Sequence, residues 1–471
     1  MNNDFSITRE NLKTYMLTSI DHIFDEIENL ETSNAQKHDL DHKFDLTIQN
    51  EGRSLEDLLP IIFTDILNNG LRTTSPHFFG YIPAGGLWTA SLAEFISTMI
   101  NRYSAVHLAA PRLAEAETEV IKSLVRMVGL DDKNAKGFLT TGGSLAHLYG
   151  ISAAINNTRN KFKQKKPIVY YSDQTHHCID KSLATLGLEK SNISIIKSDD
   201  EGKILIKELR QKIEIDLQKG HYPLLLIANA GTIHTGAVDS LTEMAELSLE
   251  YKMWFHVDAA YGGFFNLTPT GKTELKGLHL ADSLVIDPHK GMFMPYGTGC
   301  LLVKQGECLE KAFKLKSDYI PKSHTNEKAW NFADLSPELS KDNRALRMWL
   351  SLKYFGVSAF GKALEQKIEL TQYLEKKLTL IPHIKIVSRR KITTICIIHK
   401  NNDEETTDKQ TEHLLDLINR TSKAFVSSTI FKNKFVIRIC VVSHRTDKKN
   451  IDTLIEAIYE SSKKVTEDLK K

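Results

Sequence analysis

The chain has 471 residues, of which 41% are hydrophobic and 25% charged, a composition typical of a folded protein with two or three domains. A net charge of +2 argues against nucleic-acid or acidic-membrane binding, and five scattered cysteines without CxxC spacing argue against a disulfide framework or a zinc site. The sequence shows neither signal-peptide features nor an apolar run of about 20 residues, so we expect a cytoplasmic protein without membrane contact.

The N-terminal residues predict a helix followed by an arm. Apolar residues recur at helical spacing from about Thr8 to Leu30, and a polar stretch from Glu31 to Arg53 follows. Ser54 then has the chemistry of an N-cap for another helix. A helix separated from the core by such an arm packs either on a partner subunit or on its own domain, and periodicity leaves both open.

A loop rich in proline, glycine and aromatic residues spans Ser75 to Gly86. An exposed aromatic loop is unusual unless it contacts a substrate or a subunit. Phe78-Phe79-Gly80-Tyr81 would suit an aromatic amino acid as substrate, but these residues could equally pack at a subunit interface.

From Gly137 to about Lys304, short apolar runs alternate with helical stretches. The runs that predict strands are Ile168 to Tyr171, Ile193 to Ile196, Leu224 to Ala228, Trp254 to Val257, Leu284 to Ile286 and Cys300 to Val303. Nearly continuous apolar strands between helices indicate an α/β fold with a mostly parallel sheet covered on both faces. Ligands bind to such sheets at the carboxyl ends of the strands.

The C-terminal part predicts a second, smaller α+β domain. It begins with a long helix from about Arg344. The predicted strands are Ile395 to Ile398 and Phe435 to Ile439, and the further helices are about Thr411 to Arg420 and Ile451 to Ser462.

Two charged side chains follow neighbouring candidate strands. Asp258 lies in His256-Val257-Asp258-Ala259-Ala260-Tyr261-Gly262, and Lys290 lies in Asp287-Pro288-His289-Lys290-Gly291. This pair suits pyridoxal 5'-phosphate (PLP), because a lysine can form the Schiff base while an aspartate keeps the pyridine nitrogen protonated. Taken singly, Asp258 could pair with an arginine instead, and Lys290 could be a surface lysine.

Three weaker motifs stand at the ends of other apolar runs. Thr140-Thr141-Gly142-Gly143-Ser144 opens a helix, where a phosphate could bind, although a plain turn would look the same. His176 could stack on a cofactor ring or be a hydrogen-bonded loop histidine. Thr232 could contact the cofactor or merely cap a turn. Five such motifs in sequence order, each at a strand end, favour one shared site.

Together these motifs resemble the group II PLP-dependent amino-acid decarboxylases, the family of aromatic-amino-acid, glutamate and histidine decarboxylases. The resemblance extends to Asn101-Arg102-Tyr103, to the segment from Asp334 to Trp349 and to Phe435-Val436-Ile437-Arg438, so it covers most of the chain. It implies fold type I, the aspartate-aminotransferase-like fold, in a homodimer with active sites at the subunit interface. The domains expected are residues 1–85, a helical segment and arm that packs on the dimer partner, 86–345, the large PLP domain, and 346–471, the small domain.

The resemblance also implies roles for individual residues. Lys290 would carry the Schiff base, Asp258 would pair with the pyridine nitrogen, and Ala260 and His176 would lie on opposite faces of the ring. The phosphate would be held by Gly143, Ser144, Asp287 and His289, with Thr232 beside the cofactor. Lys290 and His176 would be the catalytic residues.

Two departures from the family pattern bear on specificity and on the product. His107 stands where the family usually has tryptophan, near the substrate. The segment from Pro321 to Phe332, which resembles the mobile loop, contains no tyrosine to protonate the product carbon, and Tyr319 matches that residue poorly. His176 or a residue of the partner subunit could serve instead.

The resulting hypothesis is decarboxylation of an L-amino acid to its amine and CO2. The alternatives are a PLP-dependent aldehyde synthase, lyase or aminotransferase of the same fold, and a non-catalytic protein that kept the fold. A nicotinamide oxidoreductase is disfavoured, because the glycine loop lacks GxGxxG spacing. Arg72, Arg102, Arg344 and Arg347 are candidates to bind a substrate side-chain carboxylate.

Overall fold

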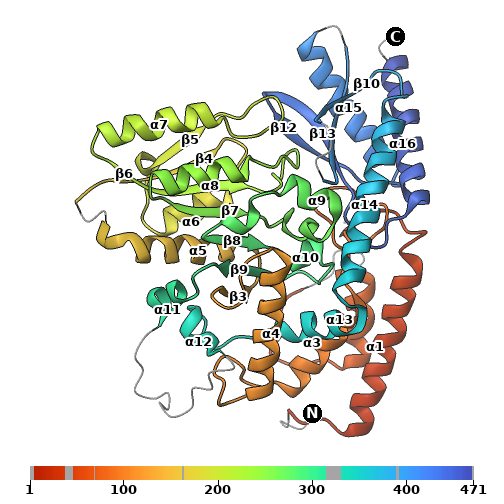
Figure 1. The fold of residues 1–471 in the computed structure, drawn as a ribbon. Coiled ribbons are helices and arrows are strands. Elements are labelled where there is room, and N and C mark those ends of the chain that lie inside the picture. Colours follow the sequence, from red (N-terminus) through yellow and green to blue (C-terminus); the bar gives the residue numbers. More distant parts are fainter. Residues whose placement is uncertain are drawn as a thin grey trace.

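The computed structural model describes residues 5–37, 46–67, 69–161, 164–314, 330–388, 392–401 and 403–468. A central sheet with helices on both faces adjoins a smaller C-terminal sheet, and a helical N-terminal segment lies at the side (Figure 1). Across these described ranges, no helix combines the length and the apolar character that a membrane span requires.

The central sheet has seven strands in the order β3-β9-β8-β7-β6-β4-β5. They are β3 (Lys136–Thr140), β4 (Pro167–Ser172), β5 (Ile193–Ile196), β6 (Tyr222–Asn229), β7 (Trp254–Asp258), β8 (Ser283–Ile286) and β9 (Gly299–Val303). Neighbours pair in parallel except for β9, which runs antiparallel to β3 and β8. The predicted mostly parallel sheet is confirmed, and all six candidate strands belong to it.

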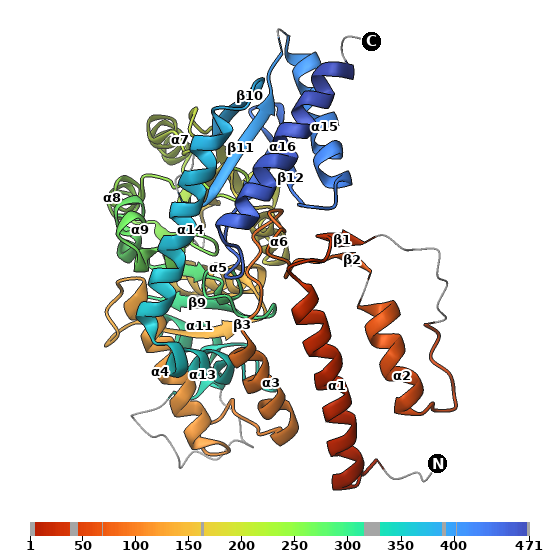
Figure 2. The same ribbon diagram turned by 90° about the vertical axis from the view of Figure 1, so that its right-hand side faces the viewer.

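Helices cover both faces of this sheet. α5 (Gly143–Thr158) and α6 (Cys178–Thr185) lie on one face, and α7 (Ile206–Gln218) and α8 (Leu241–Glu250) lie on the other (Figure 2). This double cover explains why β6 is buried along almost its whole length and why its sequence is a continuous apolar run. The shorter helices are α9 (Pro269–Glu274), α10 (Pro288–Gly291), α11 (Glu307–Phe313) and α12 (Phe332–Leu335).

The C-terminal part forms the expected α+β unit around an antiparallel sheet of order β10-β11-β13-β12. Its elements are α13 (Ala345–Phe355), α14 (Val357–Leu378), β10 (Ile384–Ser388), β11 (Thr394–His399), α15 (Glu404–Arg420), β12 (Ser427–Phe431), β13 (Lys434–Cys440) and α16 (Lys448–Asp468). The single long helix predicted from Arg344 is wrong. Gly356, with φ of 75°, turns the chain between α13 and α14.

The N-terminal segment stands beside the rest of the molecule (Figure 2). Its elements are α1 (Arg9–Asn29), β1 (Gln36–Lys37), α2 (Leu55–Ile61) and β2 (Gly70–Leu71), and they lead into α3 (Trp88–Ile100) and α4 (Pro111–Met127). Ser54 caps α2 by accepting the N–H of Asp57, as predicted. None of the residues of α1 is buried, so this helix does not cover the core of its own chain.

The aromatic loop is largely buried within its own chain. Phe78 and Phe79 are 1% and 0% exposed, and only Tyr81 is open, at 56%. The ring of Phe78 stacks on Phe425 with centroids 4.9 Å apart, and the Phe79 N–H donates to the carbonyl of Phe425. Phe79 belongs to the apolar core around the C-terminal sheet, which stabilises both segments. Phe78 and Phe79 are therefore not free to bind a substrate. The predicted domain boundaries remain predictions.

Candidate active site

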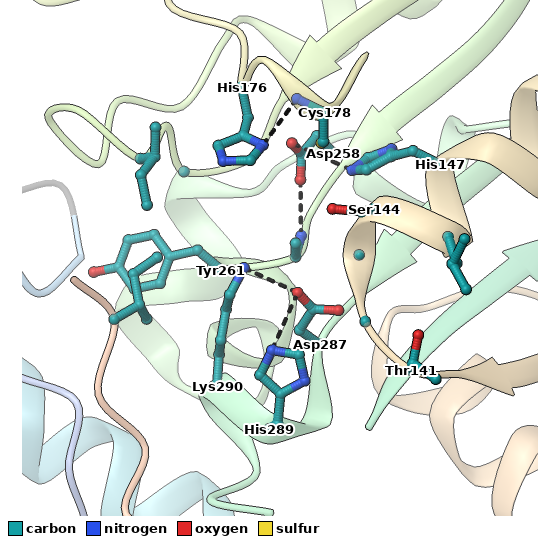
Figure 3. A pocket seen from close by; sticks show the side chains of 17 residues that line it. Thr141, Ser144, His147, His176, Cys178, Asp258, Tyr261, Asp287, His289 and Lys290 are labelled. Atoms are coloured by element: carbon teal, nitrogen blue, oxygen red, sulfur yellow. Dashed lines mark hydrogen bonds and ion pairs between the residues drawn. The ribbon is translucent and has the colours of Figure 1, made fainter. Parts of the chain in front are cut away.

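The carboxyl ends of β3, β4, β6, β7 and β8 meet at one edge of the central sheet, where a cavity of about 360 Å³ opens (Figure 3). It is lined by Ile82, Thr141, Gly142, Gly143, Ser144, Leu145, His147, His176, Cys178, Gly231, Ile233, Asp258, Ala260, Tyr261, Asp287, His289 and Lys290. All predicted site residues except Thr232 are in this set, so the structure brings the separate motifs together as a single site.

Lys290 lies in the short helix α10, directly after β8. Its Nζ is 2.9 Å from Oδ2 of Asp287, the residue that precedes the helix. Burial opposes a charge on Lys290, but the carboxylates of Asp287 and Asp258 outweigh it and raise the pKa of the amine. Asp287 thus contacts the amine, and its Oδ1 is buried without a hydrogen-bond partner in this structure. Its predicted role at the phosphate remains a prediction.

Asp258 is the last residue of β7, and its carboxylate faces the cavity. Oδ1 accepts the backbone N–H of Ala260 at 3.1 Å, and Oδ2 lies 3.4 Å from Nε2 of His147. Burial raises the pKa of Asp258, but the imidazole of His147 and the amine of Lys290 outweigh it, so the pKa is well below its usual range. An ionised carboxylate therefore stands opposite Lys290, where it can pair with a protonated ring nitrogen.

The N-terminus of α5 forms another wall of the cavity. The helix begins at Gly143, so the backbone N–H groups of its first turn point toward the cavity. A Cβ on Gly143 would lie 3.0 Å from Oδ2 of Asp287, and one on Gly142 would lie 3.4 Å from Cε1 of His289. Glycine at both positions keeps open a cradle of the size and polarity that a phosphate needs.

His176 lies in the loop between β4 and α6 and lines the cavity. Its Nδ1 accepts the N–H of Cys178 at 3.2 Å, so the proton of the neutral ring is on Nε2. Burial, reinforced by neighbouring His177, lowers the pKa of His176 to about 4, and the imidazole stays neutral near pH 7.

Thr232 is the one predicted site residue that does not line the cavity, and its place beside the cofactor remains a prediction. Its Oγ1 accepts the N–H groups of Thr235 and Ala237, and the side chain is 2% exposed. The hydroxyl therefore stabilises the turn after β6, the alternative that the sequence left open, while Gly231 and Ile233 reach the cavity.

The residues present fit PLP. Lys290 offers an amine, Asp258 offers an ionised carboxylate, and the glycine cradle at α5 with His289 offers a place for the phosphate. Lys290 and His289 follow β8, Asp258 ends β7, and the glycines follow β3, so three neighbouring parts of the fold supply these groups.

Sequence reasoning missed His147, Cys178 and Tyr261, which also line the cavity. His147 lies one turn after Gly143 on α5, so helical periodicity from the glycine cradle could have identified it. Cys178 and Tyr261 adjoin motifs already singled out, but nothing in the sequence distinguishes them from core residues.

The candidate arginines lie away from the cavity. Arg344 pairs with Glu338 and Asp342, and Arg347 with Asp342 and Glu94. Arg72 pairs with Glu26, and Arg102 is exposed. These partners give Arg344 and Arg347 a structural role between α3 and the segment before α13.

His107 does not line the cavity of its own chain either. Its N–H donates to Oδ1 of Asn331, and its ring lies 3.8 Å from Glu115. Tyr319 and most of the predicted mobile loop, residues 321–329, lie outside the described residues.

Comparisons with known proteins identify the family to which the chain is similar. A family model described as "Pyridoxal-dependent decarboxylase conserved domain" matches residues 38–400. The Aromatic-L-amino-acid decarboxylase of Bacillus atrophaeus is 32% identical, over 95% of this chain and 94% of its own length. Tyrosine decarboxylase 3 of Petroselinum crispum is 28% identical, over 88% of this chain and 84% of its own.

Solved structures share the fold. Catharanthus roseus tryptophan decarboxylase in complex with L-tryptophan superposes with a TM-score of 0.90 at 25% identity, over 98% of this chain and 100% of that one. Oryza sativa TDC with PLP and tryptamine gives 0.92 at 20% identity, over 98% and 99%. Rhodiola rosea 4-hydroxyphenylacetaldehyde synthase gives 0.89 at 24% identity, over 97% and 99%.

Proposed function

The chain belongs to the pyridoxal-dependent decarboxylase family, whose cofactor is PLP, and from this we propose that it removes the α-carboxylate of an aromatic L-amino acid to give the amine and CO2. It is a carboxy-lyase by family. The aromatic substrate and the amine product are our proposal.

The lining of the cavity carries the substrate proposal. Lys290 is the one lysine or arginine among the described residues that line it, and Lys290 is taken up by the cofactor. The described part of the chain thus supplies no second fixed cation to pair with a side-chain carboxylate, which glutamate or aspartate would require. Ile82, Ile233 and the ring of Tyr261 instead offer apolar surface. Relatives named for aromatic substrates support the same choice.

The chain's own residues position and protonate the substrate. Bound PLP supplies the electron-withdrawing ring that takes up the electrons of the broken Cα–carboxylate bond. Asp258 keeps a proton on the ring nitrogen, and the N-terminus of α5 holds the phosphate. His176, whose neutral ring carries its proton on Nε2, is the group we assign to pass a proton to the product carbon, with Nε2 taking up a proton from water in the same step.

A substrate panel tests this proposal. Purified protein with PLP receives L-tyrosine, L-tryptophan or L-phenylalanine, with L-glutamate and D-tyrosine as matched controls. We expect CO2 and the corresponding amine, identified by mass, from at least one aromatic L-amino acid and from neither control. Faster turnover of glutamate, or none with any aromatic amino acid, contradicts the substrate class.

Aldehyde formation is the second candidate, because the segment from Pro321 to Phe332 contains no tyrosine. A protein named as an aldehyde synthase shares the fold, so the fold does not decide the product. Conversion of the amine carbon to an aldehyde is a two-electron oxidation that needs an acceptor such as dioxygen. An oxygen electrode therefore separates the routes: one amine per CO2 without oxygen uptake supports our proposal, and oxygen uptake with aldehyde and ammonia supports the alternative.

We further propose that the protein is a homodimer through α1 and α3. Large apolar side chains are exposed along both helices, including Ile23, Phe24, Phe95 and Met99. A groove of about 590 Å³ between α1 and the start of α3 is also mainly apolar. An exposed apolar surface of this extent is typical of a subunit interface.

Sedimentation velocity tests the dimer. We expect the wild-type protein to sediment as a dimer and Ile23→Asp to shift it toward monomer, because the aspartate places a charge in the apolar surface. Leu249→Asp, at an exposed leucine at the end of α8, is the matched control and should remain dimeric. A wild-type monomer contradicts the proposal.

A further inference from the structure

A line of buried hydrogen bonds runs from Asp258 into the sheet, away from the cavity. Nε2 of His147 lies 3.4 Å from Asp258, and Nδ1 of His147 lies 2.9 Å from Nε2 of His256. Nδ1 of His256 lies 2.7 Å from Oγ of Ser283, which also accepts the indole N–H of Trp254 at 2.8 Å. We call Trp254, Ser283, His256 and His147 the buried relay.

The two ends of the buried relay fix the direction of its hydrogen bonds. The Trp254 indole can only donate, and the ionised carboxylate of Asp258 can only accept. Since Ser283 accepts from Trp254, its own proton is free to donate to Nδ1 of His256. His256 then donates from Nε2 to Nδ1 of His147, and His147 donates from Nε2 to Asp258. The reverse order would place two donors on Ser283 and leave its hydroxyl proton without an acceptor in the relay.

Burial favours this order, in which every polar group of the relay has a partner. His147, His256 and Ser283 are 1%, 0% and 0% exposed, so water cannot substitute for a missing partner. Burial also lowers the pKa of His256 to about 3, and the ring is neutral as the order requires. Gly150, one turn after His147 on α5, gives His256 its space, because a Cβ there would lie 2.9 Å from Cε1 of His256.

We propose that the buried relay positions Asp258 and keeps it ionised against the ring nitrogen of bound PLP, with His147, His256 and Ser283 as positioning residues. The inference rests on the proposed role of Asp258 at the cofactor. His256 and Ser283 do not belong to the described cavity lining, so they act through His147. The other titratable groups that face Asp258 are Lys290, His176 and Cys178.

The test is a pH titration of the visible absorbance of bound PLP, without substrate, in the wild type, Ser283→Ala and Ser283→Thr. A positive charge on the ring nitrogen disfavours a proton on the Lys290 nitrogen. A weakened Asp258 pair should therefore move the titration midpoint to higher pH in Ser283→Ala, and the PLP dissociation constant should rise roughly 10-fold. Ser283→Thr keeps the hydroxyl and should restore both values. Asp258→Asn, which removes the carboxylate charge, gives the full shift of the titration midpoint that loss of the Asp258 pair would cause.

Trp254→Phe is the second variant. This change removes the fixed donor but leaves Ser283 able to donate to His256, so a smaller shift of the midpoint in the same direction is expected.

If Ser283→Ala does not fold, the midpoint of Trp254→Phe decides the question by the same criterion. A wild-type midpoint in each folded variant overturns the proposal, whereas an upward shift that Ser283→Thr reverses supports it. A merely structural role would lower the unfolding temperature without moving the midpoint. Because no substrate is present, this result is independent of whether an amine is formed.

Discussion

Two carboxylates line the same cavity, and their surroundings give them different partners. Asp287 contacts the amine of Lys290, whereas Asp258 accepts from the backbone of Ala260 and faces the imidazole of His147. The contacts with Ala260 and His147 keep Asp258 ionised and leave its carboxylate able to bind a positively charged ring nitrogen. We therefore propose that Asp258 stabilises the charge at the ring nitrogen.

Replacing that charge should reduce turnover strongly. In Asp258→Asn, a neutral amide of the same shape can no longer stabilise a protonated ring, and we expect kcat to fall about 100-fold or more. Steady-state rates on the best substrate from the panel measure this. Asp282→Asn is the matched control: its carboxylate accepts the N–H of Phe255 before β8 begins, away from the cavity. Equal losses in the two variants would contradict a specific role for Asp258.

The sequence could predict these residues only in part. Asp258 and Lys290 were predictable because each follows an apolar strand within a few residues. The partner of Asp258, His147, was not predictable. Only the packing of α5 on the sheet brings His147 into contact with Asp258 and with His256, which is 109 positions away in the sequence. Thr232 was predicted beside the cofactor because it follows a strand, but its hydroxyl is used by the local turn.

At the scale of elements, the N-terminus of α5 is the feature that we propose binds the phosphate. Its free N–H groups and positive dipole end face the cavity over Gly143. The helix can approach β8 closely there because both residues of the Gly142-Gly143 pair lack side chains.

The phosphate should therefore contribute much of the cofactor affinity. We expect the apoprotein to bind PLP about 100-fold more tightly than pyridoxal, which lacks the phosphate. Gly143→Ala should weaken PLP more than pyridoxal, because the added Cβ crowds the cradle beside Asp287. Fluorescence titration of the apoprotein with both ligands measures the difference. Equal affinities in the wild type would show that the phosphate adds nothing to binding and would contradict a phosphate cradle at α5.

Elements with continuous apolar runs were predictable, and irregular ones were not. All six predicted strands of the central sheet exist, but β3 (Lys136–Thr140) was noted only as a short apolar run. β10 and β12 are partly exposed strands of the small sheet, with mixed sequences that carry little periodic signal. The break at Gly356 depends on a positive φ that helical periodicity does not reveal.

At the scale of the whole molecule, buried neutral histidines link stability to pH. Burial lowers the pKa of His256 to about 3 and that of His444 to about 4, both below the ordinary 6.5. His444 donates from Nδ1 to the carbonyl of Ala84, which joins the N-terminal loop to the C-terminal part. The unfolded chain therefore binds protons that the folded chain cannot as the pH falls from about 6.5 toward 4.

Acid should destabilise the fold within that window. The two groups together contribute stability that is complete above pH 6.5 and decreases below it, by about 2 kcal/mol for each histidine at pH 5. We expect the thermal unfolding midpoint of the apoprotein to fall between pH 7 and pH 5. His444→Gln, which keeps a donor for Ala84 but does not titrate, should reduce this fall. An unchanged or higher midpoint at pH 5 would be inconsistent with buried neutral imidazoles.

Lys290 is the residue on which the proposed site depends most, because the roles of the other cavity residues are assigned relative to its amine. The direct measurement is borohydride reduction of the PLP-bound protein followed by peptide mapping, which locates the lysine that carries the cofactor. We predict a pyridoxyl phosphate on the peptide that contains Lys290, its loss in Lys290→Ala, and its retention in Lys272→Ala, a change at an exposed lysine of α9. Label on a different lysine of the wild type would contradict the site described here.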